Sequence, residues 1–255
     1  MIYDGFMFFN ELDLLEIRLH ELKDVVDRFI LVESTLTHSG KQKPLYFANA
    51  KHEARFAPFV DRIEHVVAEL PTGAGHEPSW RRENEQRRAI GRGFTRFGHG
   101  DLLLVSDADE IPSAEAVRRY VPGTGVAGLE QVLSYFYANA LGGGWIGTRI
   151  VPYEEYIRRP DIQVYRTHLD CSIPRGGWHW SYLGGADRVR EKLASFAHTE
   201  LDTPAFMSRV DESVRDAKLI WDAAQRCRVV PVDDSFPSYL IANQERFAHL
   251  LKAVA

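Results

Sequence analysis

Residues 2–33 read IYDGFMFFNELDLLEIRLHELKDVVDRFILVE, and this stretch decides the fold class. The apolar run from Ile2 to Phe9 predicts a buried strand. Asn10 can cap a helix, and apolar residues then recur at steps of three and four, which predicts an amphipathic helix ending near Arg28. The run from Phe29 to Glu33 predicts a second strand, of the apolar kind that parallel sheets bury on both faces. Strand, helix and strand over this distance form a βαβ unit.

The alternation of strands and helices continues to about residue 120. We expect a short helix at 48–59, a strand at 62–70, a basic helix at 80–97, a strand at 102–105 and a helix at 113–120. Gly98 and Gly100 end the basic helix, and Pro112 starts the last one. This order predicts a doubly wound, mostly parallel sheet flanked by helices, which binds its ligands beyond the carboxyl ends of the strands.

The second half of the chain has a mixed α+β character. We expect a strand at 128–139, a flexible glycine loop at 142–144, a short strand at 162–167, a loop at 174–185, a helix at 187–198 and a mostly helical tail from 204. The sequence contains no internal repeat and no obvious linker, so we expect a single domain over residues 1–255.

The composition is that of an ordinary globular protein. The chain has 255 residues, of which 45% are hydrophobic and 26% charged, which suffices for a substantial core and excludes a disordered or collagen-like chain. Its formal charge of −5 argues against a dedicated nucleic-acid binder. We therefore expect no nucleic acid among its partners.

The cellular location is predicted from the cysteines and the apolar runs. Cys171 and Cys227 are too few for a disulfide framework and suit a reducing compartment. The apolar stretch at 1–9 lacks the basic start of a signal peptide, and no run approaches the roughly 20 apolar residues of a transmembrane segment. We expect a cytoplasmic protein, with peripheral association at a membrane left open.

The acidic segment SDADE at 106–110 directly follows the expected strand at 102–105. In extended backbone Asp107 and Asp109 would share one face. Two carboxylates at a strand end suit Mn²⁺ or Mg²⁺, whose shell is completed by water and phosphate oxygens, so the segment predicts a metal-bound phosphate substrate. A solvated acidic turn is the alternative. A haloacid-dehalogenase phosphatase is disfavoured because Glu110 follows the pair and three strands precede it.

Several segments resemble glycosyltransferase family 17, whose animal members add N-acetylglucosamine to N-glycans. They are 2–19, 31–35, 43–47, 106–112, 177–179 and 195–200. The resemblance implies a GT-A-like fold, a nucleotide-sugar donor (UDP-GlcNAc), a glycan acceptor, Mn²⁺ or Mg²⁺, and inversion at the anomeric carbon. It implies a nucleotide-sugar-binding half at 1–120 and an acceptor-side half with a helical tail at 121–255. Without the membrane anchor and lumenal stem of the animal enzymes, the chain resembles a bacterial or viral relative.

The resemblance also implies roles for single residues. Asp109 is expected to ligate the metal, and Asp107 to contact the metal or the donor ribose. His179 and His198 are candidates for a further metal ligand or a diphosphate contact. An inverting transferase needs a base for the acceptor hydroxyl, and Asp187, at the start of an expected helix, is the leading candidate. Its competitors are Glu200, Asp170 and Glu130.

Further residues are expected to contact the donor or a sugar. The donor-binding candidates are Phe9, Asn10, Glu11, Glu33, Arg82, Gln86 and Arg87. An arginine fork suits phosphate or base edges, although a solvated helix face and, for Phe9, core packing are equal alternatives. Trp178 and Trp180 are expected to form a wall against a sugar ring, with core anchoring as the alternative. Two other functions remain open: a metal-dependent phosphohydrolase or nucleotide-binding enzyme, and a non-catalytic sugar-binding protein.

Overall fold

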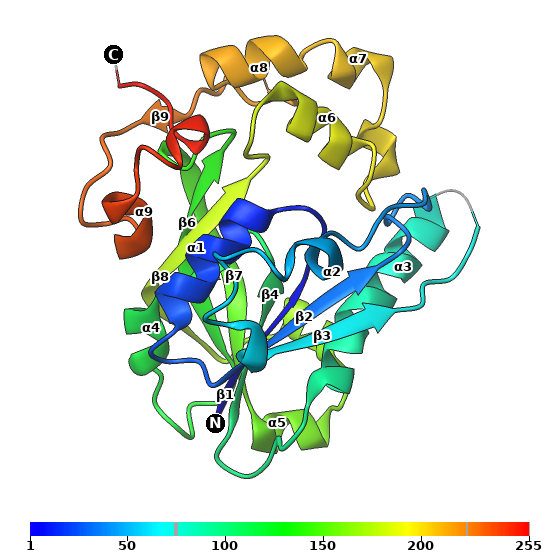
Figure 1. Ribbon diagram of the computed structural model, residues 1–255, viewed down its shortest axis with the longest axis vertical. Coiled ribbons are helices and arrows are strands. Elements are labelled where there is room, and N and C mark those ends of the chain that lie inside the picture. The colour runs from blue at the N-terminus through cyan, green and yellow to red at the C-terminus, as the bar shows by residue number, and fades with distance from the viewer. Residues whose placement is uncertain (74–75, 223, 255) are drawn as a thin grey trace.

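The computed structural model describes residues 1–73, 76–222 and 224–254, and Figure 1 shows how its elements are arranged. The first four strands are parallel and lie in the spatial order β3-β2-β1-β4. Their bounds are β1 (Ile2–Met7), β2 (Arg28–Ser34), β3 (Ile63–Ala68) and β4 (Leu102–Asp107). The connecting helices are α1 (Leu12–Leu22), α2 (Tyr46–Ala50) and α3 (His76–Arg88), with 3₁₀ turns η1 (Val60–Arg62) and η2 (Ala89–Gly93).

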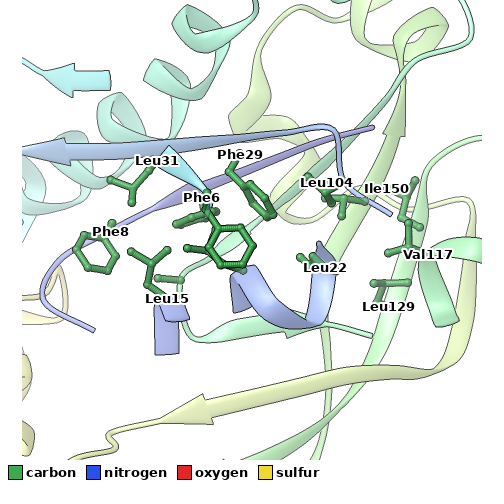
Figure 2. Close-up of a cluster of buried hydrophobic side chains, with 14 of the residues drawn as sticks. Phe6, Phe8, Leu15, Leu22, Phe29, Leu31, Leu104, Val117, Leu129 and Ile150 are labelled. Carbon is green, nitrogen blue, oxygen red and sulfur yellow. The ribbon is translucent and has the colours of Figure 1, made fainter. Parts of the chain in front are cut away.

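The apolar sequence of β2 is buried on both sides of the sheet. Phe29 and Leu31 point toward α1 and pack with Leu15 in the cluster shown in Figure 2. Ile30 and Val32 point to the opposite face, where they pack against η2. Because successive side chains of a strand alternate between faces, one run of four apolar residues supplies both cores.

The sheet continues into the second half of the chain in the order β7-β6-β8-β5, with β9 beside β7. β7 runs antiparallel to β4 and β6, β6 is parallel to β8, and β5 is antiparallel to β8. The strands are β5 (Glu110–Pro112), β6 (Ala127–Tyr135), β7 (Ala140–Pro152), β8 (Cys171–Ser181) and β9 (Arg228–Val229). The predicted fold class, a Rossmann-like sheet of the GT-A-like kind flanked by helices with a mixed second half, is confirmed.

Short helices surround this part of the sheet. They are α4 (Ala114–Arg118), α5 (Tyr153–Arg158), α6 (Ala186–Leu193), α7 (Pro204–Met207), α8 (Val210–Asp216) and α9 (Ser238–Ala242), with 3₁₀ turns η3 (Ile162–Arg166), η4 (Thr199–Leu201) and η5 (Ala248–Leu250). Figure 1 shows α6, α7 and α8 grouped at one end of the molecule and α5 at the other. Across the described ranges, no helix combines the length and hydropathy that crossing a membrane requires. Both cysteines are free thiols.

Three expectations for the second half are wrong, and strand pairing explains two of them. The glycines at 142–144 lie inside β7, where Gly143 and Gly144 pair with β6, and do not form a loop. Residues 174–181, expected in a loop, belong to β8, which pairs with β5 and β6. The strand expected at 162–167 is the 3₁₀ turn η3, which Asp161 begins by accepting a hydrogen bond from the Gln163 N–H.

Helix boundaries differ from expectation in the first half. The first helix ends at Leu22 rather than near Arg28, and α2 covers five residues instead of the range 48–59. α3 begins at His76 and ends at Arg88, after which the chain tightens into η2. Packing against the sheet decides where these helices end, and the periodicity of apolar residues in the sequence does not predict that packing.

A buried ion pair ties α1 to the ends of two strands. Arg18 of α1 and Asp4 of β1 are both fully buried, and the guanidinium donates two hydrogen bonds, of 2.7 and 2.6 Å, to the Asp4 carboxylate. The Nη1 atom of Arg18 also donates to the backbone carbonyls of Asp107, at 3.2 Å, and Glu110, at 2.9 Å. Arg18 therefore fixes the acidic turn after β4 as well as the position of α1.

We expect Arg18→Met to lower the free energy of unfolding by about 3–5 kcal/mol, because it leaves the Asp4 carboxylate buried without its partner. Urea unfolding followed by circular dichroism measures the change. Arg28→Met is the control, because the Arg28–Glu64 ion pair is exposed and should contribute no more than about 1 kcal/mol. Equal losses in the two variants would contradict this account of Arg18.

Candidate functional site

A cleft of about 640 Å³ opens beyond the carboxyl ends of β1, β2 and β4, where the topology of the sheet predicts a ligand site. Its floor includes residues that directly follow these strands, and α3, η3, β7, β8 and the segment after α6 form its walls. Segments from both halves of the chain thus line one cleft. Its charged side chains are Glu11, Lys43, Glu83, Arg87, Asp107, Asp109, Arg166 and Lys192.

Asp107, the last residue of β4, is held between two arginines. Arg87 of α3 donates to its Oδ1 atom at 3.0 Å, and the Nη2 atom of Arg166 in η3 lies 3.2 Å from Oδ2. Burial alone would raise the pKa of this carboxyl, but the charges of Arg166 and Arg87 outweigh burial and lower the pKa to about 2. Asp107 is therefore ionised at neutral pH.

Asp109 is paired with different cations. Residues 108 and 109 form a turn instead of the extended backbone that we expected, and Asp109 is 7% exposed. Lys192 of α6 donates to its Oδ2 atom at 2.6 Å, and His179 Nε2 of β8 lies 3.7 Å away. Burial opposes ionisation, yet Lys192 and His179 hold the pKa of Asp109 well below its usual range. In return, Asp109 outweighs the effect of burial and raises the pKa of both partners.

The oxygen ligands of this turn fit a hard divalent cation. Mg²⁺ and Mn²⁺ take one or two protein carboxylates and obtain their other ligands from water and substrate phosphates. Within the described residues, no group of three or more His, Cys, Asp or Glu side chains forms a complete metal cage. Asp107 and Asp109 are the two carboxylates of this turn that could contribute to a metal site, and His179 lies beside Asp109. His198 lines the same cleft, but it pairs with Glu200.

The predicted donor-binding residues fall into two groups. Phe9, Glu11, Gln86 and Arg87 line the cleft. The other three do not line it: Asn10 lines a neighbouring cavity, and Glu33 and Arg82 are buried elsewhere.

Glu33 and Arg82 have structural partners. Glu33 accepts hydrogen bonds from the N–H groups of Phe47, at 2.9 Å, and Ala48, at 3.2 Å, and so fixes α2. Arg82 donates to the carbonyls of His38, at 2.6 Å, and Gly73, at 2.8 Å, and so holds two loops together. A polar residue at the end of a strand, such as Glu33, or on a basic helix, such as Arg82, has the same sequence pattern whether it anchors the fold or binds a ligand.

Trp178 and Trp180 do not line the cleft, but Trp180 lines the neighbouring cavity that Asn10 also lines. The Trp178 indole donates to the Ser235 carbonyl at 3.0 Å, and Trp180 is 1% exposed within a hydrophobic cluster. The tryptophans that line the cleft are Trp80, Trp221 and Trp145. Trp145 of β7 donates to Glu110 at 2.7 Å and is 38% exposed. Its signal in the sequence, a tryptophan after three glycines, was obscured by the expectation of a loop there.

Asp187 lies outside the cleft. Its side chain is fully exposed at the start of α6 and pairs with Arg190 at 3.2 Å. Its three competitors are also absent from the lining of the cleft: Glu200 pairs with His198, Glu130 accepts from Ser172, and Asp170 accepts from the Val126 N–H. Arg166, Lys192 and Tyr182 are cleft residues that sequence reasoning missed, because their own segments carry no motif. Lys43 was also missed, although it begins the segment 43–47 that resembles the family.

Carboxylates and cations at the carboxyl edge of an α/β sheet are typical of enzymes that act on phosphorylated ligands. A sequence model of glycosyltransferase family 17 matches residues 1–142, and the chain is 31% identical, over 95% of its length, to the β-1,4-mannosyl-glycoprotein 4-β-N-acetylglucosaminyltransferase of Rattus norvegicus. The chain therefore belongs to glycosyltransferase family 17. The protein of the same name from Homo sapiens is 25% identical over the same share of the chain.

The chain spans about half the length of the curated relatives it matches, since the alignments cover 53% of each. Among solved structures, Francisella tularensis 2-C-methyl-D-erythritol 4-phosphate cytidylyltransferase superposes with a TM-score of 0.36 and 8% identity, covering 68% of this chain and 90% of that one. A likeness of that extent is too small to bear on fold or function.

The depressed pKa of Asp107 predicts how stability depends on pH. Its folded pKa of about 2 lies below the ordinary value of 3.8, so its ionised form stabilises the fold above pH 3.8, and this contribution is lost as the pH falls through about 2. We expect Asp107→Asn to reduce the fall in unfolding free energy between pH 5 and pH 2.5, measured by urea unfolding. Asp24→Asn, at an exposed carboxylate, is the control. A parent-like fall in Asp107→Asn would refute the prediction.

Proposed function

We propose that this glycosyltransferase is a metal-dependent, inverting enzyme that transfers N-acetylglucosamine from UDP-GlcNAc to a hydroxyl group of a mannosyl glycan. The observation that carries the proposal is the acidic turn at 107–109, which lies in a cleft among cations at the ligand-binding edge of the sheet. The name of the mammalian relatives, which specifies a mannosyl glycoprotein and N-acetylglucosamine, supports this choice of donor sugar and acceptor.

Fixed positive charge in the cleft suits a nucleoside diphosphate. Arg87, Arg166 and Lys192 lie at the two carboxylates, so their guanidinium and ammonium groups are already oriented where a diphosphate would enter. Preorganised charge of this kind stabilises a leaving diphosphate without reorganisation during the reaction. Asp107 and Asp109 would hold the Mn²⁺ or Mg²⁺ ion, which would neutralise further negative charge on the departing UDP.

The aromatic wall of the cleft suits the donor sugar. Trp145 and Tyr182 both line the cleft near the acidic turn, and the Trp145 ring centroid lies 5.1 Å from that of His179. The Arg166 guanidinium lies 5.7 Å from the Trp145 ring, and the Glu110 carboxylate accepts its indole N–H, so the ring has a fixed orientation. A rigid indole face with little conformational entropy to lose can pack against a pyranose ring.

We expect UDP to bind at least about tenfold more tightly with Mn²⁺ than in EDTA, because the metal ion would be attracted both to Asp107 and Asp109 and to the diphosphate, in addition to the fixed cations of the cleft. Isothermal titration calorimetry of the same protein in the two buffers measures both affinities. Uridine is the control, since without phosphates it should be insensitive to the metal. Equal affinity for UDP in Mn²⁺ and EDTA would mean that the arginines and Lys192 bind the diphosphate without a metal.

We expect Asp109→Asn to reduce transfer from UDP-GlcNAc on the order of 10²–10³-fold, because it removes charge that acts on the transition state. A coupled assay for released UDP measures the rate, and circular dichroism checks the fold. Asp24→Asn, an exposed substitution of the same chemistry between α1 and β2, should retain the parent rate. Full activity in a folded Asp109→Asn protein would assign the metal to other residues.

A further inference from the structure

A second cavity, of about 320 Å³, lies beside the cleft. Four residues line both spaces and so form their common border: Glu11, Asp109, Tyr182 and Lys192. The rest of the second cavity is formed by the start of α1, the loop between β8 and α6, α6 itself and the segment near η5. A transferase must bring two substrates together at one point, and this border is where two adjoining spaces meet.

The second cavity offers both hydrogen-bonding groups and apolar surface. Arg188 of α6, Arg55 and His249 all line it. Asp13 accepts hydrogen bonds from both Arg55 and His249 at 2.8 Å, so these charges compensate one another. Paired charges beside leucine and aromatic side chains suit a ligand that is neutral and rich in hydroxyl groups, which is the chemistry of a sugar ring.

Glu11 is the carboxylate of the common border whose position is fixed by the backbone. It lies at the start of α1, where its Oε2 atom accepts hydrogen bonds from the N–H groups of Phe9, at 3.2 Å, and Asn10, at 3.0 Å. Within the described part of the chain, no hydrogen bond reaches its other oxygen, Oε1. Asp109, the second border carboxylate, is instead a proposed metal ligand and accepts a hydrogen bond from Lys192 on Oδ2.

We propose that the second cavity is the acceptor subsite for a mannosyl ring and that Glu11 is the base that receives the proton of the acceptor hydroxyl. This inference rests on the proposed function. The acceptor oxygen forms a bond to the anomeric carbon of the donor, and the bond from that carbon to the β-phosphate oxygen breaks. The electron pair of the broken bond leaves with UDP, and the hydroxyl proton passes to Glu11 Oε1.

Burial favours the proton-accepting role of Glu11. Desolvation raises the pKa of its carboxyl, with Lys192 opposing this rise and Asp109 adding to it. A carboxylate with a raised pKa is a stronger base than an exposed one. The geometry therefore favours Glu11 over Asp187, whose carboxylate is exposed and lines neither cavity.

The base is tested with Glu11→Gln, which keeps an oxygen for the two backbone N–H groups but cannot take up the proton. We expect UDP release from UDP-GlcNAc, with water or with p-nitrophenyl β-mannoside as the acceptor, to fall about 10²–10⁴-fold. UDP affinity, measured by calorimetry, should stay within about threefold of the parent, because the substitution spares the diphosphate contacts. Asp187→Asn is measured in parallel. A parent-like rate in Glu11→Gln, or a loss confined to Asp187→Asn, would overturn the assignment.

The acceptor subsite is tested with a matched pair of substitutions on α6. Arg188 lines the second cavity and does not line the cleft, whereas Arg190 lines neither. We expect Arg188→Ala to raise the KM for p-nitrophenyl β-mannoside roughly 2–10-fold through the loss of a hydrogen bond, with UDP affinity unchanged. Arg190→Ala should keep the parent KM. An unchanged KM in Arg188→Ala, or equal changes in both variants, would place the acceptor elsewhere.

Binding measurements separate this inference from the proposed function. A parent protein that binds UDP but, by saturation-transfer NMR in the presence of UDP, does not bind the mannoside would overturn the acceptor subsite and leave the donor site standing. A parent protein that binds neither UDP nor UDP-GlcNAc would overturn the proposed function itself.

Discussion

The ion pair between Arg18 and Asp4 is the contact on which the rest of the site depends. It lies wholly inside the protein, where a lone charge would be costly, so each side chain requires the other. Through the same guanidinium, α1 is joined both to β1 and to the turn that follows β4. This one side chain therefore sets the direction of the first helix, the ends of two strands and the position of the acidic turn.

The electrostatics of the cleft follow from where that turn lies. Asp107 faces cations from α3 and η3, and Asp109 faces a cation from α6, so each carboxylate is held by an element from a different part of the chain. Such pairs hold the carboxylates ionised despite burial and hold the basic groups in one orientation. The cleft is thus organised before a ligand arrives, which reduces the entropy that binding must overcome.

The sequence predicted the parallel half of the fold because its signals are local. The apolar run at 29–33 by itself indicates a buried strand, and the acidic segment at 106–110 by itself indicates a site at the end of a strand. Residues 174–181 were misplaced because their strand pairs with segments distant in the sequence, β5 and β6. Glycines 142–144 were misplaced because their composition suggests a loop, although they pair with the neighbouring strand β6. In the site, Asp107 and Asp109 were visible in the sequence as a motif. Lys192 and Arg166 lie in segments whose sequence is that of an ordinary protein surface, so only the fold shows that these side chains reach the cleft.

Arg18 supports the acidic turn through main-chain atoms of that turn. The acceptors that Arg18 uses at 107 and 110 are backbone carbonyls, which every amino acid carries. Exchange of the side chains at 107 and 109 therefore leaves this support intact. Over evolutionary time the turn is a position where selection can alter the chemistry presented to a ligand while the path of the chain persists, so new specificities can arise here without a new fold.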